Sequence, residues 1–134
     1  GRLKNVRAIQ ATFSAFAAIL DDGSVVTWGK PGAGAGGDSK SVQGRLKNVR
    51  AIQATFSAFA AILDDGSVVT WGDPGDGGDS ESVQGQLKNV RGIQATSYGA
   101  FAAILADGSV VTWGKPGDGG DSESVQGWVC CDMG

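Results

Sequence analysis

Glycine-rich loops carry the carboxylates that are best placed for chemistry in this chain. The second such loop runs Asp73-Pro-Gly-Asp76-Gly-Gly-Asp79-Ser-Glu81, and the third holds Asp118, Asp121 and Glu123 at the same places. Calcium prefers several such oxygen ligands. However, the spacing differs from that of an EF-hand loop, and the first loop keeps only Asp38, between Lys30 and Lys40. We therefore expect solvated acidic turns and no metal site, with calcium binding as the alternative.

Nucleophilic catalysis needs a base beside the nucleophile, and the sequence supplies no obvious one. Cys130 and Cys131 are the only cysteines, and the chain has no histidine to pair with them or with a serine. The glycine-rich run of residues 29–37 is not followed by the Gly-Lys-Ser/Thr of a phosphate-binding loop. We predict no catalytic residue and no cofactor. The lack of a disulfide framework favours an intracellular location, cytoplasmic or nuclear.

The charge balance argues against two classes of partner. Eleven basic and 14 acidic residues give the 134-residue chain a net charge of -3, whereas nucleic acids and anionic lipids attract basic surfaces. No apolar run approaches the ~18 residues that span a bilayer. Basic residues do recur, as Arg2-Lys4-Arg7, Arg45-Lys47-Arg50 and Lys88-Arg91. They would line one rim of a stacked array, opposite the acidic loops, and either steer a charged partner or form solvated strand faces.

A tandem repeat organises the chain and must position all of these residues. Residues 1–29 are identical to residues 44–72, and residues 74–85 recur as residues 116–127. A Trp-Gly pair marks each copy, at Trp28-Gly29, Trp71-Gly72 and Trp113-Gly114. We divide the chain into unit 1 (1–43), unit 2 (44–85), unit 3 (86–127) and a non-repeat tail (128–134). Since Gly1 opens in mid-pattern, we expect an excerpt of a longer protein.

Each unit is predicted to be an all-β structure. In unit 1, short runs rich in β-branched and aromatic residues predict strands over residues 6–12, 15–20 and 24–28, with a weaker fourth strand at residues 41–43. A helix over residues 15–20 is the rival, but the segment is short and ends at an Asp-Gly turn. This turn closes a hairpin in every unit, at Asp22-Gly23, Asp65-Gly66 and Asp107-Gly108.

The units are expected to stack, because one small sheet cannot bury a core alone. Phe16, Trp28 and their copies should fill the seams between units. The middle tryptophan, Trp71, should be covered from both sides, so Trp71→Ala is expected to destabilise the protein more than the same change at Trp28 or Trp113.

The repeated string resembles the regulator of chromosome condensation repeat, a four-stranded propeller blade. In unit 2 the matching positions are Ile52, Ala54, Ala61, Ile62, Asp65, Gly66, Val68, Trp71 and Gly72. Thr55 and Ala58 replace a usual glycine and histidine, and Gly77-Gly78-Asp79-Ser80 replaces the family's Gly-Gln-Leu-Gly. The resemblance implies blades of a ring of about seven. Because propellers generally need 4–8 blades, three units should form an open partial propeller.

These features predict a non-catalytic protein-interaction scaffold that contributes part of a larger propeller. The resemblance offers two alternatives, a fragment of a guanine-nucleotide exchange propeller or of the substrate-recruiting region of a HECT-type ubiquitin ligase. A duplicated segment with no activity of its own is a further possibility. The partner is expected to be a protein of unknown identity. The isolated chain should also self-associate, since both ends of an open arc lack a neighbour.

Overall fold

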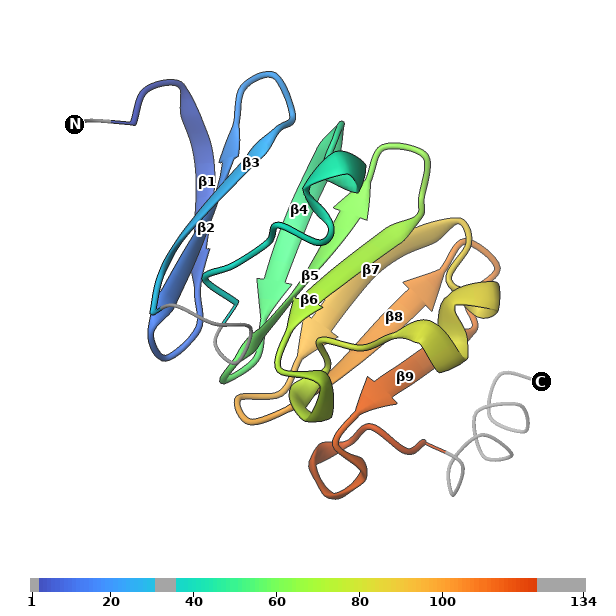
Figure 1. Cartoon of the computed structure of the whole chain (residues 1–134). Coiled ribbons are helices and arrows are strands. Elements are labelled where there is room, and N and C mark those ends of the chain that lie inside the picture. Colours follow the sequence, from blue (N-terminus) through green and yellow to red (C-terminus); the bar gives the residue numbers. More distant parts are fainter. Residues whose placement is uncertain (1–2, 31–35, 123–134) are drawn as a thin grey trace.

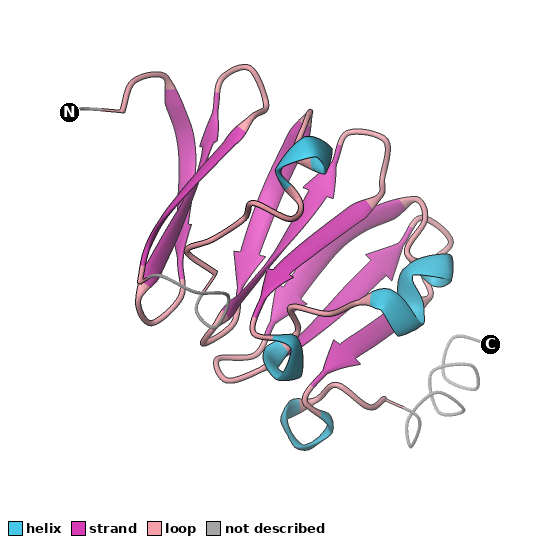
Figure 2. Ribbon diagram, in the orientation of Figure 1, coloured by secondary structure: helices cyan, strands magenta, loops and turns pink. Residues whose placement is uncertain are grey.

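The computed structural model describes residues 3–30 and 36–122, which form three antiparallel sheets side by side (Figures 1 and 2). Each unit contributes one three-stranded sheet in which the second strand is central. The sheets comprise β1 (Val6–Ala11), β2 (Ala15–Leu20) and β3 (Val25–Gly29); β4 (Val49–Ala54), β5 (Ala58–Leu63) and β6 (Val68–Gly72); and β7 (Val90–Ala95), β8 (Ala100–Leu105) and β9 (Val110–Gly114). The all-β array predicted from the repeat is confirmed, and it is an open one.

Alternation along the central strands explains the stacking. Successive side chains of a strand point to opposite faces, so Ala58 and Ala60 face one way along β5 while Phe59 and Ala61 face the other. Both sets are buried. Pairing of Phe59 with Trp71 across β5 and β6 sets the two rings side by side. A unit of this kind has two apolar faces and needs a neighbour on each.

The fourth strand predicted at residues 41–43 is wrong. A 3-10 helix, η2 (Gln43–Arg45), lies there, and η4 (Glu81–Gln86) takes the same place in unit 2. Side chains replace the missing strand ladder at the free edge of the sheet. In unit 2, Gln84 Nε2 donates to Val68 O at 3.2 Å and to Ser80 Oγ at 2.7 Å, and the Ser80 hydroxyl lies 2.9 Å from that of Thr70. The preceding Pro-Gly segments form the short 3-10 turns η3 (Pro74–Asp76) and η5 (Pro116–Asp118).

Two apolar clusters form the core, and each lies between two units. The first joins Ala17, Ile19 and Val25 of unit 1 to Leu46, Ile52, Phe59 and Trp71 of unit 2. The second repeats the arrangement between units 2 and 3. The core is therefore made of seams, as expected for a repeat array. Among the described residues, no helix is long and apolar enough to cross a membrane.

Candidate interaction surfaces

The Phe–Trp pairs of units 2 and 3 each pack beneath the glycine-rich loop of the preceding unit. Trp71 Nε1 donates to Gly36 O at 3.0 Å, and its ring stacks on that of Phe59 with centroids 5.2 Å apart. A Cβ on Gly36 would lie 2.6 Å from the Phe59 ring, so only glycine fits at this close approach. Trp113 makes the equivalent bond to Gly77 O at 3.1 Å. The glycine loops thus act as lids over the aromatic pair of the next unit.

This geometry corrects the expected ranking of the tryptophans. Trp71 and Trp113 are both 3% exposed, whereas Trp28 is 37% exposed. Trp71 and Trp113 each face the preceding unit, and the described residues include no unit before that of Trp28. Trp71 is therefore not covered from both sides, and Trp113 is equally buried.

The Asp-Gly turns contact the following unit. Gly66 has a φ of 84°, and its carbonyl accepts the backbone N–H of Val90 at 2.9 Å. A Cβ on Gly66 would lie 2.9 Å from Asn89 Cα, a backbone atom. Gly23 makes the same contacts with Asn48 and Val49. The turns therefore close their own hairpins and also hold the next unit.

The aspartates of these turns are held in the charged form. Asp65 Oδ1 accepts the Ser67 hydroxyl at 2.6 Å and the Ser67 backbone N–H at 2.9 Å. These two hydrogen bonds, the hydroxyl's first, lower the pKa of Asp65 below its ordinary 3.8. The same pair of bonds lowers the pKa of Asp22 and of Asp107. All three side chains lie in water, and their role is to fix the turn.

Two of the recurring basic residues also belong to the seams. Arg7 Nη2 donates to Val49 O at 2.6 Å, and Arg50 Nη2 donates to Val90 O at 2.9 Å. The expected basic rim is therefore partly wrong. Arg7 and Arg50 bond the next unit, and Asp21 lies at the same end of the sheet, because its N–H donates to Asn5 O. Arg2 lies outside the described residues.

Three carboxylates of the second acidic loop are engaged within the protein. Asp73 Oδ1 and Asp79 Oδ1 each accept a loop N–H at 2.9 Å. Asp76 accepts the Ser57 hydroxyl at 2.5 Å and lies 3.6 Å from Lys115 Nζ of unit 3. Within residues 3–30 and 36–122, no three such ligands gather in a way that could hold a metal ion. Glu123, Cys130, Cys131 and the tail 128–134 lie outside the described residues.

A ridge of aromatic rings crosses the three units at the β1–β2, β4–β5 and β7–β8 turns. Phe13 stacks on Phe56 with centroids 4.4 Å apart, and Phe56 lies 6.3 Å from Tyr98. These three residues, the aromatic ridge, are 51%, 44% and 68% exposed. Lys30 Nζ lies 5.8 Å from the Phe13 centroid. Sequence reasoning missed the ridge, although an aromatic residue before the second strand of every unit was the available signal.

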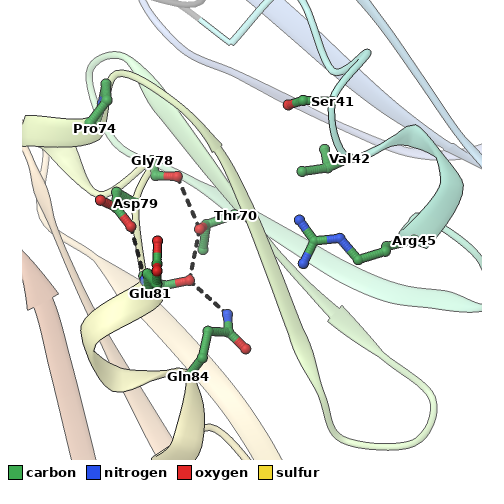
Figure 3. A pocket seen from close by; sticks show the side chains of 10 residues that line it. Ser41, Val42, Arg45, Thr70, Pro74, Gly78, Asp79, Glu81 and Gln84 are labelled. Atoms are coloured by element: carbon green, nitrogen blue, oxygen red, sulfur yellow. Dashed lines mark hydrogen bonds between the residues drawn. The ribbon is translucent and has the colours of Figure 1, made fainter.

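A groove of about 470 Å³ runs along the outer edge between units 1 and 2 (Figure 3). Arg45 extends into it from η2, and Asp79 and Glu81 lie on the opposite wall. The Thr70 hydroxyl on its floor bonds Gly78 O at 3.1 Å and also meets Ser80. The groove is thus polar, and hydrogen bonds within the protein already occupy its hydroxyl groups.

No protein-family model and no curated protein sequence matches the chain. Solved structures do match its fold. A crystal structure of human WBSCR16 superposes with a TM-score of 0.60 at 18% sequence identity, over 85% of this chain and 35% of that one. Yeast RCC1 (Prp20), in a crystal structure in which it is bound to Kap60, gives a TM-score of 0.61 at 18% identity, over 81% of this chain and 29% of that one. The fold is that of part of an RCC1-like propeller.

The RCC1-like architecture agrees with the resemblance seen in the repeat. This chain spans about a third of the length of the two proteins that it matches. Of the Asp-Gly turns and Trp-Gly pairs that the repeat singled out, the turns of units 1 and 2 and the tryptophans of units 2 and 3 lie at the seams between units. Thr55, at a usual glycine position of the repeat, donates its hydroxyl to Asp76 O at 2.9 Å and so ties the β4–β5 turn to the acidic loop.

Proposed function

We propose that this chain is a non-catalytic interaction scaffold that contributes RCC1-like units to a larger propeller and binds a protein partner through the aromatic ridge. The observation that carries the proposal is the exposure of Phe13, Phe56 and Tyr98 in one continuous row. Aromatic residues are enriched in protein interfaces, where they supply much of the binding energy. The complex of yeast RCC1 with Kap60 supports a protein as the kind of ligand.

The alternatives that the resemblance offers find no specific support in the described residues. Guanine-nucleotide exchange and substrate recruitment to a ubiquitin ligase belong to whole proteins, and this chain spans about a third of its structural matches. The aromatic ridge, by contrast, is formed by one residue of each of the three described units. A ridge of rings has no acid–base pair to offer, so its use is recognition. We place the scaffold inside the cell, in keeping with the sequence.

The test is a binding comparison with two matched variants. A protein partner captured by chemical crosslinking to the wild-type chain should lose at least tenfold in affinity when Phe56 and Tyr98 are changed to serine. It should bind the Glu81→Gln variant, which alters the polar groove, as it binds the wild type. Equal binding by all three proteins would contradict the ridge. Accelerated nucleotide release from a small GTPase by the chain alone would contradict the non-catalytic assignment.

A further inference from the structure

The outer faces of units 1 and 3 carry the residue types that are buried where one unit stacks on the next. The first-unit face comprises Leu3, Ile9, Phe16 and Trp28, which are 47%, 50%, 44% and 37% exposed. The same residue types in units 2 and 3, which have a preceding unit, are at most 4% exposed; they are Leu46, Ile52, Phe59, Trp71, Leu87, Ile93, Phe101 and Trp113. Among the described residues, the first-unit face thus carries the side chains of a seam but has no unit packed on it.

The third-unit face is the complementary half. It comprises Ala102, Ile104 and Val110, which stand where Ala17, Ile19 and Val25 of unit 1 meet unit 2. Ile104 is 39% exposed, whereas Ile19 and Ile62 are 2% and 3% exposed. Among the described residues, nothing lies within 4 Å of a Cβ built on Gly108, although the equivalent Gly23 and Gly66 each meet an asparagine of the next unit.

Polar groups at the two faces are matched as well. Within the described residues, Trp28 Nε1 has no hydrogen-bond acceptor, and the acceptor used by Trp113 is the carbonyl of Gly77, whose counterpart in unit 3 is Gly119. Arg91 stands where Arg7 and Arg50 each bond a valine carbonyl of the next unit. Docking unit 3 of one copy against unit 1 of another would supply these missing partners.

The charges of the loops select the first unit as the partner. Across the seam between units 2 and 3, Asp76 lies 3.6 Å from Lys115. Unit 3 presents Asp118 at the position of Asp76, and unit 1 presents Lys30 at the position of Lys115. Unit 2 has Asp73 at that position instead. The first-unit face therefore offers Asp118 a cation, where a face like that of unit 2 would set two carboxylates together.

We propose that, in the isolated 134-residue chain, the third-unit face of one copy binds the first-unit face of a second copy, in the place that further units would take in a larger propeller. The contact is heterologous, because each chain uses its third-unit face to bind one copy and its first-unit face to bind another. The assembly therefore either closes into a ring or continues as a filament. The inference goes beyond the proposed function and rests on the seams, not on the aromatic ridge. Its failure would leave ridge binding untouched.

The test uses two face variants of the 134-residue chain, Trp28→Glu and Ile104→Glu, in light scattering coupled to gel filtration. Wild type should form higher oligomers at micromolar concentration. Each variant alone should be a monomer of 13.5 kDa, because each keeps only one working face. An equimolar mixture should form a species of twice that mass and nothing larger, because the intact first-unit face of the Ile104 variant meets the intact third-unit face of the Trp28 variant.

Controls separate this contact from other ways of associating. Tyr98→Glu, on the aromatic ridge, should oligomerise like wild type; its loss of association would overturn the proposal. So would a wild type that stays monomeric, a mixture that stays monomeric while both variants are folded, or an Ile104→Glu variant that still dimerises. Circular dichroism and thermal unfolding establish that the variants are folded. If Trp28→Glu is not, Lys30→Asp with Ile9→Glu replaces it on the same face.

Discussion

At the scale of the residue, identical side chains differ in what they contribute, because they differ in what covers them. Trp71 and Trp113 each stack on a phenylalanine and donate to a glycine carbonyl of the preceding unit. Trp28 also stacks on its phenylalanine, at 5.4 Å, but is 37% exposed. Burial, and not residue type, therefore sets the free-energy cost of removing each ring.

Alanine at either buried tryptophan should destabilise the protein to a similar degree. Truncating a buried aromatic side chain costs about 3–5 kcal/mol, so Trp71→Ala and Trp113→Ala should each lower the free energy of unfolding by that order. Trp28→Ala should cost clearly less, since its ring keeps a third of its surface in water. Urea unfolding of the three variants measures this ranking. A loss at Trp28 as large as at Trp71 would show that the seams do not decide stability.

Two turn glycines allow backbone strain to be separated from contact between units. Gly66 and Gly108 have nearly the same positive φ, 84° and 87°, so alanine strains both equally, by roughly 1–2 kcal/mol. Only at Gly66 would the new Cβ also lie 2.9 Å from a backbone atom of the next unit, Asn89 Cα. Overpacking of this kind costs about 1–3 kcal/mol more. Chemical denaturation should find Gly66→Ala the less stable variant, and equal stabilities would argue against the turn–unit contact.

At the scale of the element, the hairpin turns make stability depend on acid pH. The pKa values of Asp22, Asp65 and Asp107 are lowered below 3.8 in the folded protein, first by the serine hydroxyl two residues on and then by its backbone N–H. A lowered pKa means that the charged form stabilises the fold. This contribution is complete above pH 3.8 and is lost as the pH falls through the folded values.

Replacing the three turn aspartates by asparagine should flatten the acid limb of the stability curve. An asparagine Oδ1 still accepts the turn hydrogen bonds, so the hairpins should form, but the group no longer titrates. Melting temperatures measured from pH 5 down to about pH 2 should therefore fall less steeply than those of the wild type. Changing Ser24, Ser67 and Ser109 to alanine should also reduce the slope, by removing the first cause of the pKa shift. An unaltered slope in both variants would refute this account.

At the scale of the whole molecule, three sheets share two seams, so only the middle sheet has a neighbour on each side (Figure 1). Units 1 and 2 are identical over 29 residues up to the Trp-Gly pair. Stability in repeat arrays is the sum of unit and neighbour terms. Differences between β2 and β5 must therefore come from position in the array.

Amide hydrogen exchange should resolve this difference. The unfolded-state exchange rates of β2 and β5 are equal, because their sequences and flanking residues are the same. The amides of β5 should exchange more slowly than those of β2, since opening the middle sheet breaks both seams. Using the Ile104→Glu variant removes contacts between copies from the comparison. Equal protection of β2 and β5 would mean that the units open independently.

The strands and hairpin turns of this protein could be predicted from its sequence. Alternating apolar residues and the Asp-Gly turns predicted the three strands of each unit nearly to the residue, and the repeat predicted the open array. These signals are local, because a strand face and a turn are set by residues a few positions apart. The prediction of a fourth strand was wrong because strand propensity does not register hydrogen bonds that side chains make to a sheet edge. Gln84 and Ser80 satisfy the sheet edge through their side chains, so no further strand is needed there.

Which face of each unit meets a neighbour could not be predicted from the sequence and became visible in the packing of the three sheets. Phe16 and Phe59 lie in identical stretches of sequence, yet they are 44% and 0% exposed. A repeat cannot encode in its own residues whether another repeat precedes it. The aromatic ridge arises in the same way, since Phe13 and Phe56 are 43 positions apart and meet only because the units stack in register. Contacts between units are fixed by three-dimensional packing, and the function proposed for this chain depends on them.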